Sequence, residues 1–387
     1  MQGSEHMSGI VIIGTGLAGY TLARELRKLD RDTALTLVTA DDGAFYSKPM
    51  LSNAFASNKD PEALISQSAE AMAGQLDARI LTRRRVASMD TAARQVRLED
   101  GEILDYDRLV LAVGAEPIRL SYEGDGAEGV LSVNSREDYA RFREAIEGVD
   151  RVAVIGPGLI GCEFANDLRG SGCQVDVIGP DTAPLGRLVP EAVGRALQKG
   201  LEAVGIRFHL ETVVERIDRA DAGLRLTLSN GKTVEAGAIL SAVGLRPDTR
   251  LARTSGLEVN RGIVVDRTLA TSAEGVYALG DCAEVSGLVL PYVMPIMHGA
   301  RALAKTLAGE PTEVSYPVMP VVVKTPAHPV VVAPPPPGAA GDWHIGAVGE
   351  GVRALFRNGD QLAGFVLTGA EAVKEKQALA KQVPAVL

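Results

Sequence analysis

The sequence predicts an α/β protein in which one strand–turn–helix unit occurs twice and a small α+β domain follows. The first unit is the apolar run of residues 10–13, which leads into the glycine turn G-T-G-L-A-G at residues 14–19. The second is the apolar run of residues 152–155, which leads into G-P-G-L-I-G at residues 156–161. One such glycine spacing can arise by chance, but a second copy with its strand and helix in place indicates a repeated unit.

The first glycine turn has the residues that a pyrophosphate site requires. Four β-branched residues precede it and predict a buried parallel strand, and the residues after it have the apolar spacing of an amphipathic helix. Gly14 allows the tight turn, Gly16 lets the ligand approach the backbone, and Gly19 lets helix and strand pack closely. Leu17 and Ala18 lie where the helix N-terminus offers free N–H groups to an anion. The alternative is an ordinary tight turn between a strand and a helix.

The second glycine turn repeats these features, so the chain has two predicted dinucleotide sites. Its ligand contacts are expected at Gly156, Gly158, Leu159, Ile160 and Gly161. Glu163 lies on the helix that follows, and Gly244 ends the apolar run of residues 238–243.

The acid that binds the adenosine ribose usually lies about twenty residues beyond the glycine turn. In the first unit Asp41 has this place, with Asp42 as the alternative, and both could instead be turn acids. In the second unit the strand of residues 174–178 is followed by Gly-Pro-Asp, and the usual acid is missing from the strand end. The nearest cation that could meet a 2′-phosphate is Arg187, so the sequence favours NAD over NADP.

Other stretches are expected around the first ligand. Taken alone, Lys48 is expected to be an ordinary surface lysine. The alternative is that it lies beside a pyrophosphate or flavin ring, where it would add a charge-assisted contact. An apolar strand that includes Ala112 ends at Gly114, and such an ending lets a strand pass close beneath a ligand. Gly280-Asp281 places a carboxylate suited to a ribityl chain at another strand end. A predicted helix from Pro291 to Leu307, which includes Val293, would turn its N-terminus toward a reduced flavin ring.

Composition excludes several classes of function. The net charge of -9 argues against a generic nucleic-acid binder, although the run of residues 83–85, three arginines, could dock an acidic protein or be a solvated turn. The three cysteines, Cys162, Cys173 and Cys282, have neither C-x-x-C nor metal-ligand spacing, so no zinc site, other metal site or dithiol is expected. No apolar run is long enough to span a bilayer and no signal peptide is evident, so a cytoplasmic protein without membrane attachment is expected.

With both glycine turns, the strand ending at Gly114 and the Gly280-Asp281 turn, residues 9–387 resemble the two-dinucleotide-fold flavoprotein reductases, whose type is glutathione reductase. The resemblance implies a domain that binds FAD non-covalently (8–115 and 247–315), an inserted domain that binds NADH (116–246) and a C-terminal domain (316–387). The FAD contacts that it implies are Gly14, Gly16, Gly19, Asp41, Lys48, Pro49, Gly114 and Asp281. The NADH contacts that it implies are Gly156, Gly158, Gly161, Glu163 and Gly244.

Members of this family differ in how electrons leave the flavin, and two branches use a redox cysteine for it. Residues 46–52, Y-S-K-P-M-L-S, contain no cysteine in the corresponding region. Together with V-K-T-P at residues 323–326 and E-K-Q-A-L at residues 375–379, Y-S-K-P is similar to the rubredoxin and flavorubredoxin reductases. The dioxygenase-coupled ferredoxin reductases usually have an arginine and a double proline where this chain has Lys-Pro-Met at residues 48–50, which weakens the ferredoxin alternative.

The resemblance implies that the chain takes a hydride from NADH onto FAD and passes electrons singly to rubredoxin, acting as a monomer. Glu163 would help to place the nicotinamide, and Lys48 and Lys324 would stabilise the anionic reduced ring. Lys324 could instead be a surface lysine on a strand. Two other functions stay open, a ferredoxin reductase of an oxygenase system and an NADH-binding redox sensor that signals through conformation.

Overall fold

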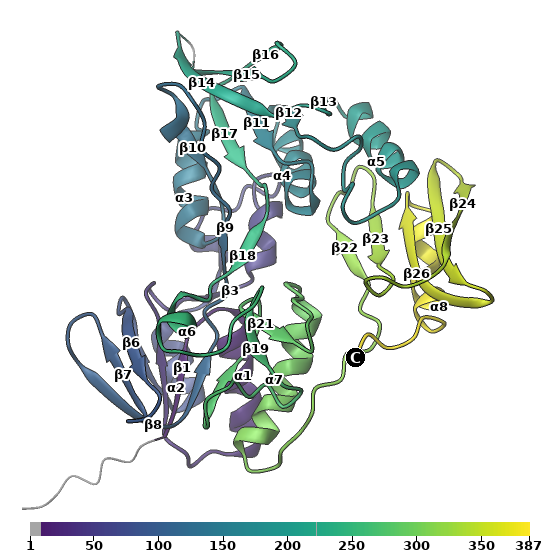
Figure 1. The fold of residues 1–387 in the computed structure, drawn as a ribbon. Coiled ribbons are helices and arrows are strands. Elements are labelled where there is room, and N and C mark those ends of the chain that lie inside the picture. Colours follow the sequence, from purple (N-terminus) through teal and green to yellow (C-terminus); the bar gives the residue numbers. More distant parts are fainter. Residues whose placement is uncertain (1–8, 222) are drawn as a thin grey trace, which may run out of the picture.

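The computed structural model describes residues 9–221 and 223–387, and it consists of two dinucleotide folds and a C-terminal domain (Figure 1). Residue 8, where the first domain was expected to begin, lies outside the described residues. The predicted α/β fold with two Rossmann-like units and a small α+β domain is confirmed.

The first dinucleotide fold is built on a sheet with parallel strands in the order β5-β2-β1-β8, and β20 pairs with β8. These strands are β1 (Gly9–Ile13), β2 (Leu35–Val38), β5 (Arg79–Leu81), β8 (Ile103–Leu111) and β20 (Val276–Ala278). The antiparallel strands β6 (Val86–Asp90) and β7 (Gln95–Leu98) extend the sheet from the first half of β8. All five residues of β1 are buried, as expected of a central parallel strand.

Helices α1 (Leu17–Leu29) and α7 (Val293–Leu307) pack against each other and against this sheet. The buried face of α1 includes Leu22, Ala23 and Leu26, so the predicted amphipathic helix is confirmed. Smaller elements complete the fold: α6 (Arg250–Thr254), β19 (Ile263–Val265) and β21 (Ala283–Val285).

The second dinucleotide fold is a five-stranded parallel sheet in the order β10-β17-β11-β12-β13. Its strands are β10 (Val130–Leu131), β11 (Arg151–Ile155), β12 (Gln174–Ile178), β13 (Ile206–His209) and β17 (Ala238–Ser241). Helices α3 (Arg136–Ala145), α4 (Leu159–Gly170) and α5 (Glu191–Ala203) cover one face. The antiparallel strands β14 (Val214–Ala220), β15 (Gly223–Leu228) and β16 (Thr233–Ala236) cover the other. The 3-10 turn η3 (Ala127–Gly129) precedes β10.

The chain enters and leaves the second fold through one two-stranded ribbon, made by β9 (Ala115–Pro117) and β18 (Leu245–Pro247). Between β2 and β5 a long excursion contains β3 (Phe45–Tyr46), η1 (Lys48–Asn53), η2 (Glu62–Leu64), β4 (Ile65–Gln67) and α2 (Ala69–Leu76). The sequence predicts one helix from about Pro61 to Gly74, and the first half of that prediction is wrong, because η2 and β4 occupy it. The Ser68 hydroxyl accepts a bond from the Ala71 N–H at 3.2 Å, which starts the helix at Ala69.

The C-terminal domain is an antiparallel sheet in the order β22-β23-β26-β25-β24 with a short helical segment behind it. Its elements are β22 (Val321–Val323), β23 (Val330–Ala333), β24 (Asp342–Val348), β25 (Gly351–Asn358), β26 (Gln361–Thr368), η4 (Ala372–Glu375) and α8 (Lys376–Ala380). Asn358-Gly359 between two apolar runs predicts a hairpin, and the structure has that hairpin: it joins β25 to β26, with Gly359 at φ +58°. The other face of the sheet packs on the core of the second fold, beside α5.

Candidate active site

The first glycine turn joins β1 to α1, and its three glycines have different surroundings. Gly14 has φ +113°, and a Cβ there would overlap the carbonyl oxygen of Ala112. A Cβ at Gly19 would overlap the carbonyl oxygen of Gly14. At Gly16, the N-cap of α1, a Cβ would meet no atom within 4 Å. Packing therefore requires two of the glycines, and the third faces open space in front of helical N–H groups that lack intrahelical partners.

The second glycine turn, between β11 and α4, repeats this geometry. Gly156 has φ +108°, and a Cβ there would lie 2.6 Å from the carbonyl oxygen of Ala242. A Cβ at Gly161 would overlap the carbonyl oxygen of Gly156, whereas Gly158 faces open space. Leu159 and Ile160 form the first turn of α4, and Gly244, at φ +114°, follows β17. The sequence repeat is thus a repeat of structure, with one open glycine at each helix N-terminus.

The two acids proposed for the adenosine ribose have different partners. Oδ1 of Asp41 accepts hydrogen bonds from the Thr39 hydroxyl at 2.6 Å and the Gly43 N–H at 2.9 Å, and at 3.4 Å from Thr15 in the glycine turn. Asp42 instead forms an ion pair with the largely buried Arg136 of α3. The geometry thus favours Asp41 over Asp42.

The charges of Lys48 and Asp281 act on each other near the first glycine turn. Burial lowers the pKa of Lys48, and the charge of Asp281 opposes that shift. Burial raises the pKa of Asp281, and the charge of Lys48 opposes it in turn. Gly280, at φ +85°, packs against α1, where a Cβ would lie 2.8 Å from the Cβ of Ala18.

Two further predicted residues lie near open space. Gly114 follows β8 with φ +73°, and a Cβ there would meet no atom within 4 Å. Val293 begins α7 and leaves 39% of its surface exposed. Open glycines at two strand or helix ends, a partly buried acid and a partly buried cation are the features that fit an anionic dinucleotide with a ribityl chain.

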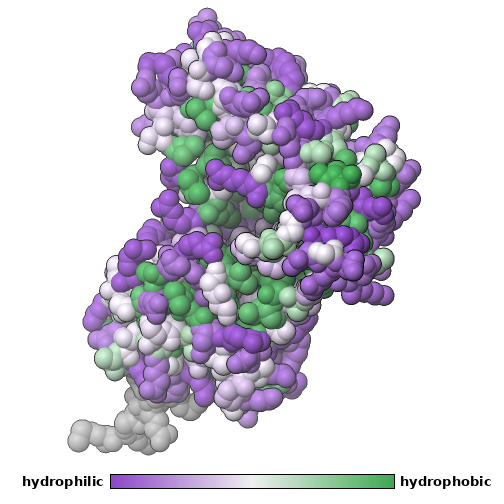
Figure 2. Space-filling model, turned by 45° about the vertical axis from the view of Figure 1, so that its right-hand side comes forward, coloured by the Kyte–Doolittle hydropathy of each residue, from purple (hydrophilic) through white to green (hydrophobic). Residues whose placement is uncertain are grey.

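Glu163 and Lys324 meet where the three parts of the molecule join. Glu163 is fully buried on α4, and its Oε2 accepts a hydrogen bond from the Ser52 hydroxyl at 2.6 Å. Its Oε1 accepts the Lys324 backbone N–H at 2.9 Å, and the Lys324 ammonium forms an ion pair with the same carboxylate. Lys324 lies just after β22, and 28% of its side chain is exposed, so it is a partly buried lysine held in an ion pair. Figure 2 shows a hollow in the molecule near this junction, with hydrophobic residues around it.

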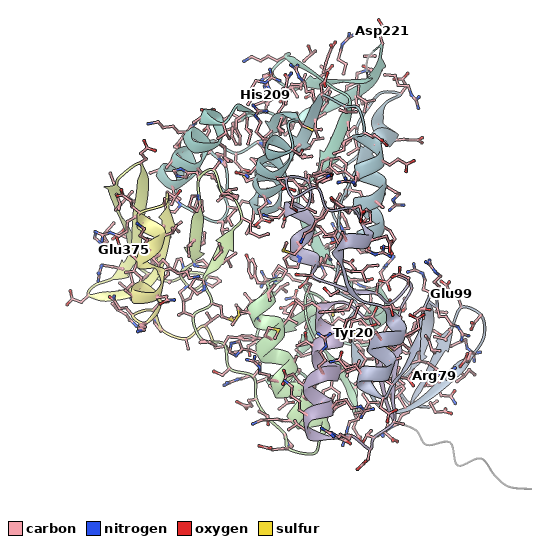
Figure 3. All side chains as sticks on the ribbon, turned by 180° about the vertical axis from the view of Figure 1, so that it is seen from behind. Tyr20, Arg79, Glu99, His209, Asp221 and Glu375 are labelled. Carbon is pink, nitrogen blue, oxygen red and sulfur yellow. The ribbon has the colours of Figure 1, made fainter. Side chains whose placement is uncertain are left out.

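The arginine run of residues 83–85 does not lie at this junction. Arg84 pairs with Asp100 and Glu102, and Arg85 lies 3.8 Å from Glu99. Figure 3 places Glu99 on the side of the first fold that is farthest from Glu375 of the C-terminal domain. Acids therefore offset the charges of Arg84 and Arg85, and the run lies away from the C-terminal domain (Figure 3).

Cys162 and Cys282 are buried thiols, unsuited to redox chemistry. Burial raises the pKa of Cys162 to about 12 and that of Cys282 to about 11, so both stay protonated.

Over residues 9–221 and 223–387, no group of His, Cys, Asp and Glu side chains could hold a metal ion. In the same part of the chain, no helix has the length and apolar character needed to cross a membrane.

Three residues with contacts around the site were missed by sequence reasoning: Ser52 binds Glu163, Arg136 pairs with Asp42, and Asp167 accepts the Phe55 and Ala56 N–H groups. Asp167 follows Glu163 by four positions on α4, and that spacing places two acids on one helix face. This pattern could have drawn attention to Asp167. Ser52 and Arg136 carry no comparable local signal, because their partners are far away in the sequence.

Comparison with known proteins gives the chain's relatives. Residues 8–304 match the family described as pyridine nucleotide-disulphide oxidoreductase, and residues 313–383 match the rubredoxin binding C-terminal domain. The chain is 50% identical over 383 residues to a rubredoxin-NAD(+) reductase of Alcanivorax borkumensis, covering 98% of this chain and all of that protein. It is 49% identical over 386 residues to a rubredoxin-NAD(+) reductase of Acinetobacter baylyi, covering 98% of each.

Solved structures share the fold at lower sequence identity. The ferredoxin reductase of the CYP199A2 system from Rhodopseudomonas palustris has a TM-score of 0.87 at 24% identity, over 98% of this chain and 96% of that one. The NADH:rubredoxin oxidoreductase of Clostridium acetobutylicum has a TM-score of 0.81 at 19% identity, over 97% and 94%. The chain therefore belongs to the pyridine nucleotide-disulphide oxidoreductases, in the family of the rubredoxin-NAD(+) reductases.

Proposed function

We propose that this chain is an FAD-dependent NADH:rubredoxin oxidoreductase, which moves a hydride from NADH to FAD and passes electrons singly to rubredoxin. The contact between Glu163 and Lys324 carries the proposal. It joins the helix that begins at the second glycine turn to the domain that matches the rubredoxin binding family. The names of the two relatives, at about half identity over the whole chain, support the same acceptor.

Each nucleotide is assigned to one fold. We place FAD in residues 8–115 and 247–315, NADH in residues 116–246, and the main rubredoxin contact in residues 316–387. The FAD residues are Gly14, Gly16, Leu17, Ala18, Gly19, Asp41, Lys48, Pro49, Ala112, Gly114, Gly280, Asp281, Val293 and Lys324. The NADH residues are Gly156, Gly158, Leu159, Ile160, Gly161, Glu163 and Gly244.

Bound FAD accepts two electrons as a hydride and releases them one at a time, as a one-iron carrier requires. The chain holds each pyrophosphate at a helix N-terminus, in front of Gly16 and Gly158, where backbone N–H groups attract an anion. Asp41 binds the adenosine ribose, and Asp281 accepts hydrogen bonds from the ribityl hydroxyls. Lys48 and the N-terminus of α7 favour the negative charge that arrives with the electrons.

The structure refines the roles of Glu163 and Lys324. Protein donors reach both carboxylate oxygens of Glu163, so this residue acts on the nicotinamide site by holding Lys324 and Ser52. Lys324 supplies a fixed cation where the C-terminal domain meets the other two units. The charge of Asp281 acts on Lys48, whereas Lys324 pairs with Glu163, so the two lysines have different acidic partners.

Stopped-flow spectroscopy tests the proposal directly. The FAD-loaded protein is reduced with NADH and then mixed with rubredoxin or, in parallel, with a plant-type or oxygenase ferredoxin. We expect rapid flavin reduction and rapid reoxidation by rubredoxin, with slower reoxidation by ferredoxin. A flavin that NADH reduces and rubredoxin leaves reduced would contradict the proposed acceptor. A flavin that no one-electron acceptor reoxidises would favour the redox sensor.

Charge steering adds a second expectation. Rubredoxins are typically acidic, so Lys48 and Lys324 would attract them despite the chain's net charge of -9. We expect the rate of rubredoxin reduction to fall as salt rises, whereas unchanged rates would contradict electrostatic steering. A monomeric state and a cytoplasmic location stay predictions, which light scattering and cell fractionation would test.

A further inference from the structure

Asp167 of α4 binds the backbone of a segment that belongs to the other dinucleotide fold in sequence. Its side chain is almost fully buried, and the residue is 4% exposed. Oδ2 accepts the Phe55 N–H at 2.8 Å, and Oδ1 accepts the Ala56 N–H at 3.0 Å. Both carboxylate oxygens thus hold the chain just beyond η1, the element that begins with Lys48.

Two more contacts lie on the same face of α4. One turn before Asp167, Glu163 accepts the Ser52 hydroxyl. One turn after it, a Cβ at Gly170 would lie 3.1 Å from the Cβ of Ala56. Positions 163, 167 and 170 follow the helical repeat, so α4 supports residues 52–56 along three successive turns.

Packing also ties this segment to the second fold. Leu51, Ala54 and Phe55 are buried in the core that contains β11 and α4. The Phe55 ring lies 4.8 Å from that of Tyr139 and 5.6 Å from that of Phe142, both on α3. The position of the segment that carries Lys48 therefore depends on α4. The first turn of α4 follows the second glycine turn.

From these contacts we infer that Asp167 is a positioning residue. It fixes residues 48–56, here named the Lys48 segment, against α4, and so sets where Lys48 stands relative to the nicotinamide site. The inference rests on the proposed function, in which Lys48 faces the flavin.

The chemistry of the carboxylate explains why an acid stands at this buried position. A carboxylate accepts two N–H groups through two oxygens, whereas an asparagine amide has one acceptor oxygen and an NH₂ group. Asn at position 167 would fill nearly the same volume and turn a donor toward one of the two N–H groups. The Asp167→Asn change therefore loosens the Lys48 segment while it leaves the apolar packing in place.

The test compares Asp167→Asn with Asp360→Asn, a change in the exposed turn between β25 and β26. Hydrogen–deuterium exchange of the FAD-loaded protein measures the exchange rate of the peptide that spans residues 51–57. Stopped-flow spectroscopy measures the rate of flavin reduction by NADH. For Asp167→Asn we expect faster exchange in that peptide and flavin reduction slowed about ten- to a hundredfold, the scale of a misplaced catalytic group. The Asp360→Asn protein should match the wild type in both readouts.

A double-mutant cycle shows whether the effect passes through Lys48. In a Lys48→Met background, Asp167→Asn should slow flavin reduction by less than about twofold, because the group that it positions is gone. Unchanged exchange in residues 51–57 would overturn the inference. So would faster exchange with wild-type flavin reduction, and so would an equal loss of rate in the Lys48→Met background.

If Asp167→Asn fails to fold, Ser52→Ala takes its place, since it removes one hydroxyl contact to Glu163. Ser52→Ala should also speed exchange in residues 51–57 and slow flavin reduction, both by less than Asp167→Asn. Unchanged exchange and unchanged flavin reduction would overturn the inference. Neither readout needs rubredoxin, so the acceptor is tested separately. A wild-type protein that NADH reduces and rubredoxin does not reoxidise contradicts the proposed function, while the exchange and coupling data still decide the role of Asp167.

Discussion

The backbone at Gly14 lies so close to Ala112 that a Cβ at position 14 would overlap the Ala112 carbonyl oxygen, whereas Gly16 faces open space. The two glycines of one turn should therefore respond differently to alanine. Gly14→Ala should prevent folding of the first unit, because the overlap adds to a strained φ of +113°. Gly16→Ala should fold and bind FAD at least about tenfold more weakly, a loss of ~1.4 kcal/mol.

Circular dichroism and FAD titration of the two apoproteins check this difference. Gly158→Ala, the equivalent change in the second turn, should leave FAD binding intact and weaken NADH binding. Equal FAD affinity in Gly16→Ala and wild type would show that the ligand does not approach this turn.

The ion pair between Glu163 and Lys324 should contribute both to the stability of the fold and to the transfer of electrons to rubredoxin. Lys324→Ala leaves a buried carboxylate with fewer donors, and the free energy of unfolding should fall by about 3 kcal/mol, the lower end for a broken buried pair because Lys324 is partly exposed. Urea unfolding measures that loss, and stopped-flow should show slower rubredoxin reduction.

Glu163→Gln with Lys324→Ala completes a double-mutant cycle for this pair. The double variant should lose less stability than the sum of the single variants, since each change removes the same interaction. Lys374→Ala, an exposed lysine of η4, is the control and should be neutral. Strict additivity would mean that the two side chains do not stabilise each other in solution.

Asp176 on β12 should make the protein sensitive to acid. It accepts hydrogen bonds from Arg207 at 2.6 and 2.9 Å and from His209 at 2.8 Å, at the edge of the second fold where Figure 3 shows His209. Burial acts to raise the pKa of Asp176, but the bonds from His209 and Arg207 outweigh it and lower the pKa below the usual 3.8.

A lowered carboxyl pKa stabilises the fold above the unfolded-state value, and that stability is lost as pH falls through the folded-state value. Asp176→Asn should cost about 2 kcal/mol at pH 7, the scale of charged hydrogen bonds, and less below pH 4. Thermal unfolding across this range measures the difference, with Asp360→Asn as control. A cost that stays constant from pH 7 to pH 3 would contradict this account.

Gly200 of α5 provides a way to disturb the contact between the second fold and the C-terminal domain. A Cβ there would lie 2.5 Å from the His328 side chain, which is buried just beyond Lys324. Gly200→Ala should displace this turn, slow rubredoxin reduction and leave flavin reduction by NADH nearly unchanged. Gly74→Ala on α2, where a Cβ meets nothing within 4 Å, is the control and should stabilise slightly. If flavin reduction by NADH slowed as much as rubredoxin reduction, the C-terminal domain would also control hydride transfer to the flavin.

Local patterns predicted much of the fold. Each glycine turn lies within ten residues of its strand and helix, so spacing alone indicated the strand, the turn and the helix. The helix expected from Pro61 failed because Ser68 caps a helix that starts only at Ala69, and the cap competes with an apolar pattern that is ambiguous over a short stretch.

The contacts that organise the site were beyond local reasoning. Glu163 was predicted as a site residue, but its bond to Ser52 spans 111 positions and its bond to Lys324 spans 161. Only the folded arrangement brings such residues together. Local patterns also could not show which acid acts on each lysine: Lys324 pairs with Glu163, and the charge of Asp281 acts on Lys48.

The sheet of the first fold contains strands from before and after the second fold in the sequence. This arrangement constrains the order in which the two folds can be completed during synthesis. The second fold lies between β9 and β18, and each of its parallel strands comes from residues 130–241. The sheet around β1 receives β20 only when residues 276–278 have been made. On the ribosome, the second unit can thus complete its sheet while the first still waits for a strand, so a chaperone would meet an unfinished N-terminal half beside a finished middle.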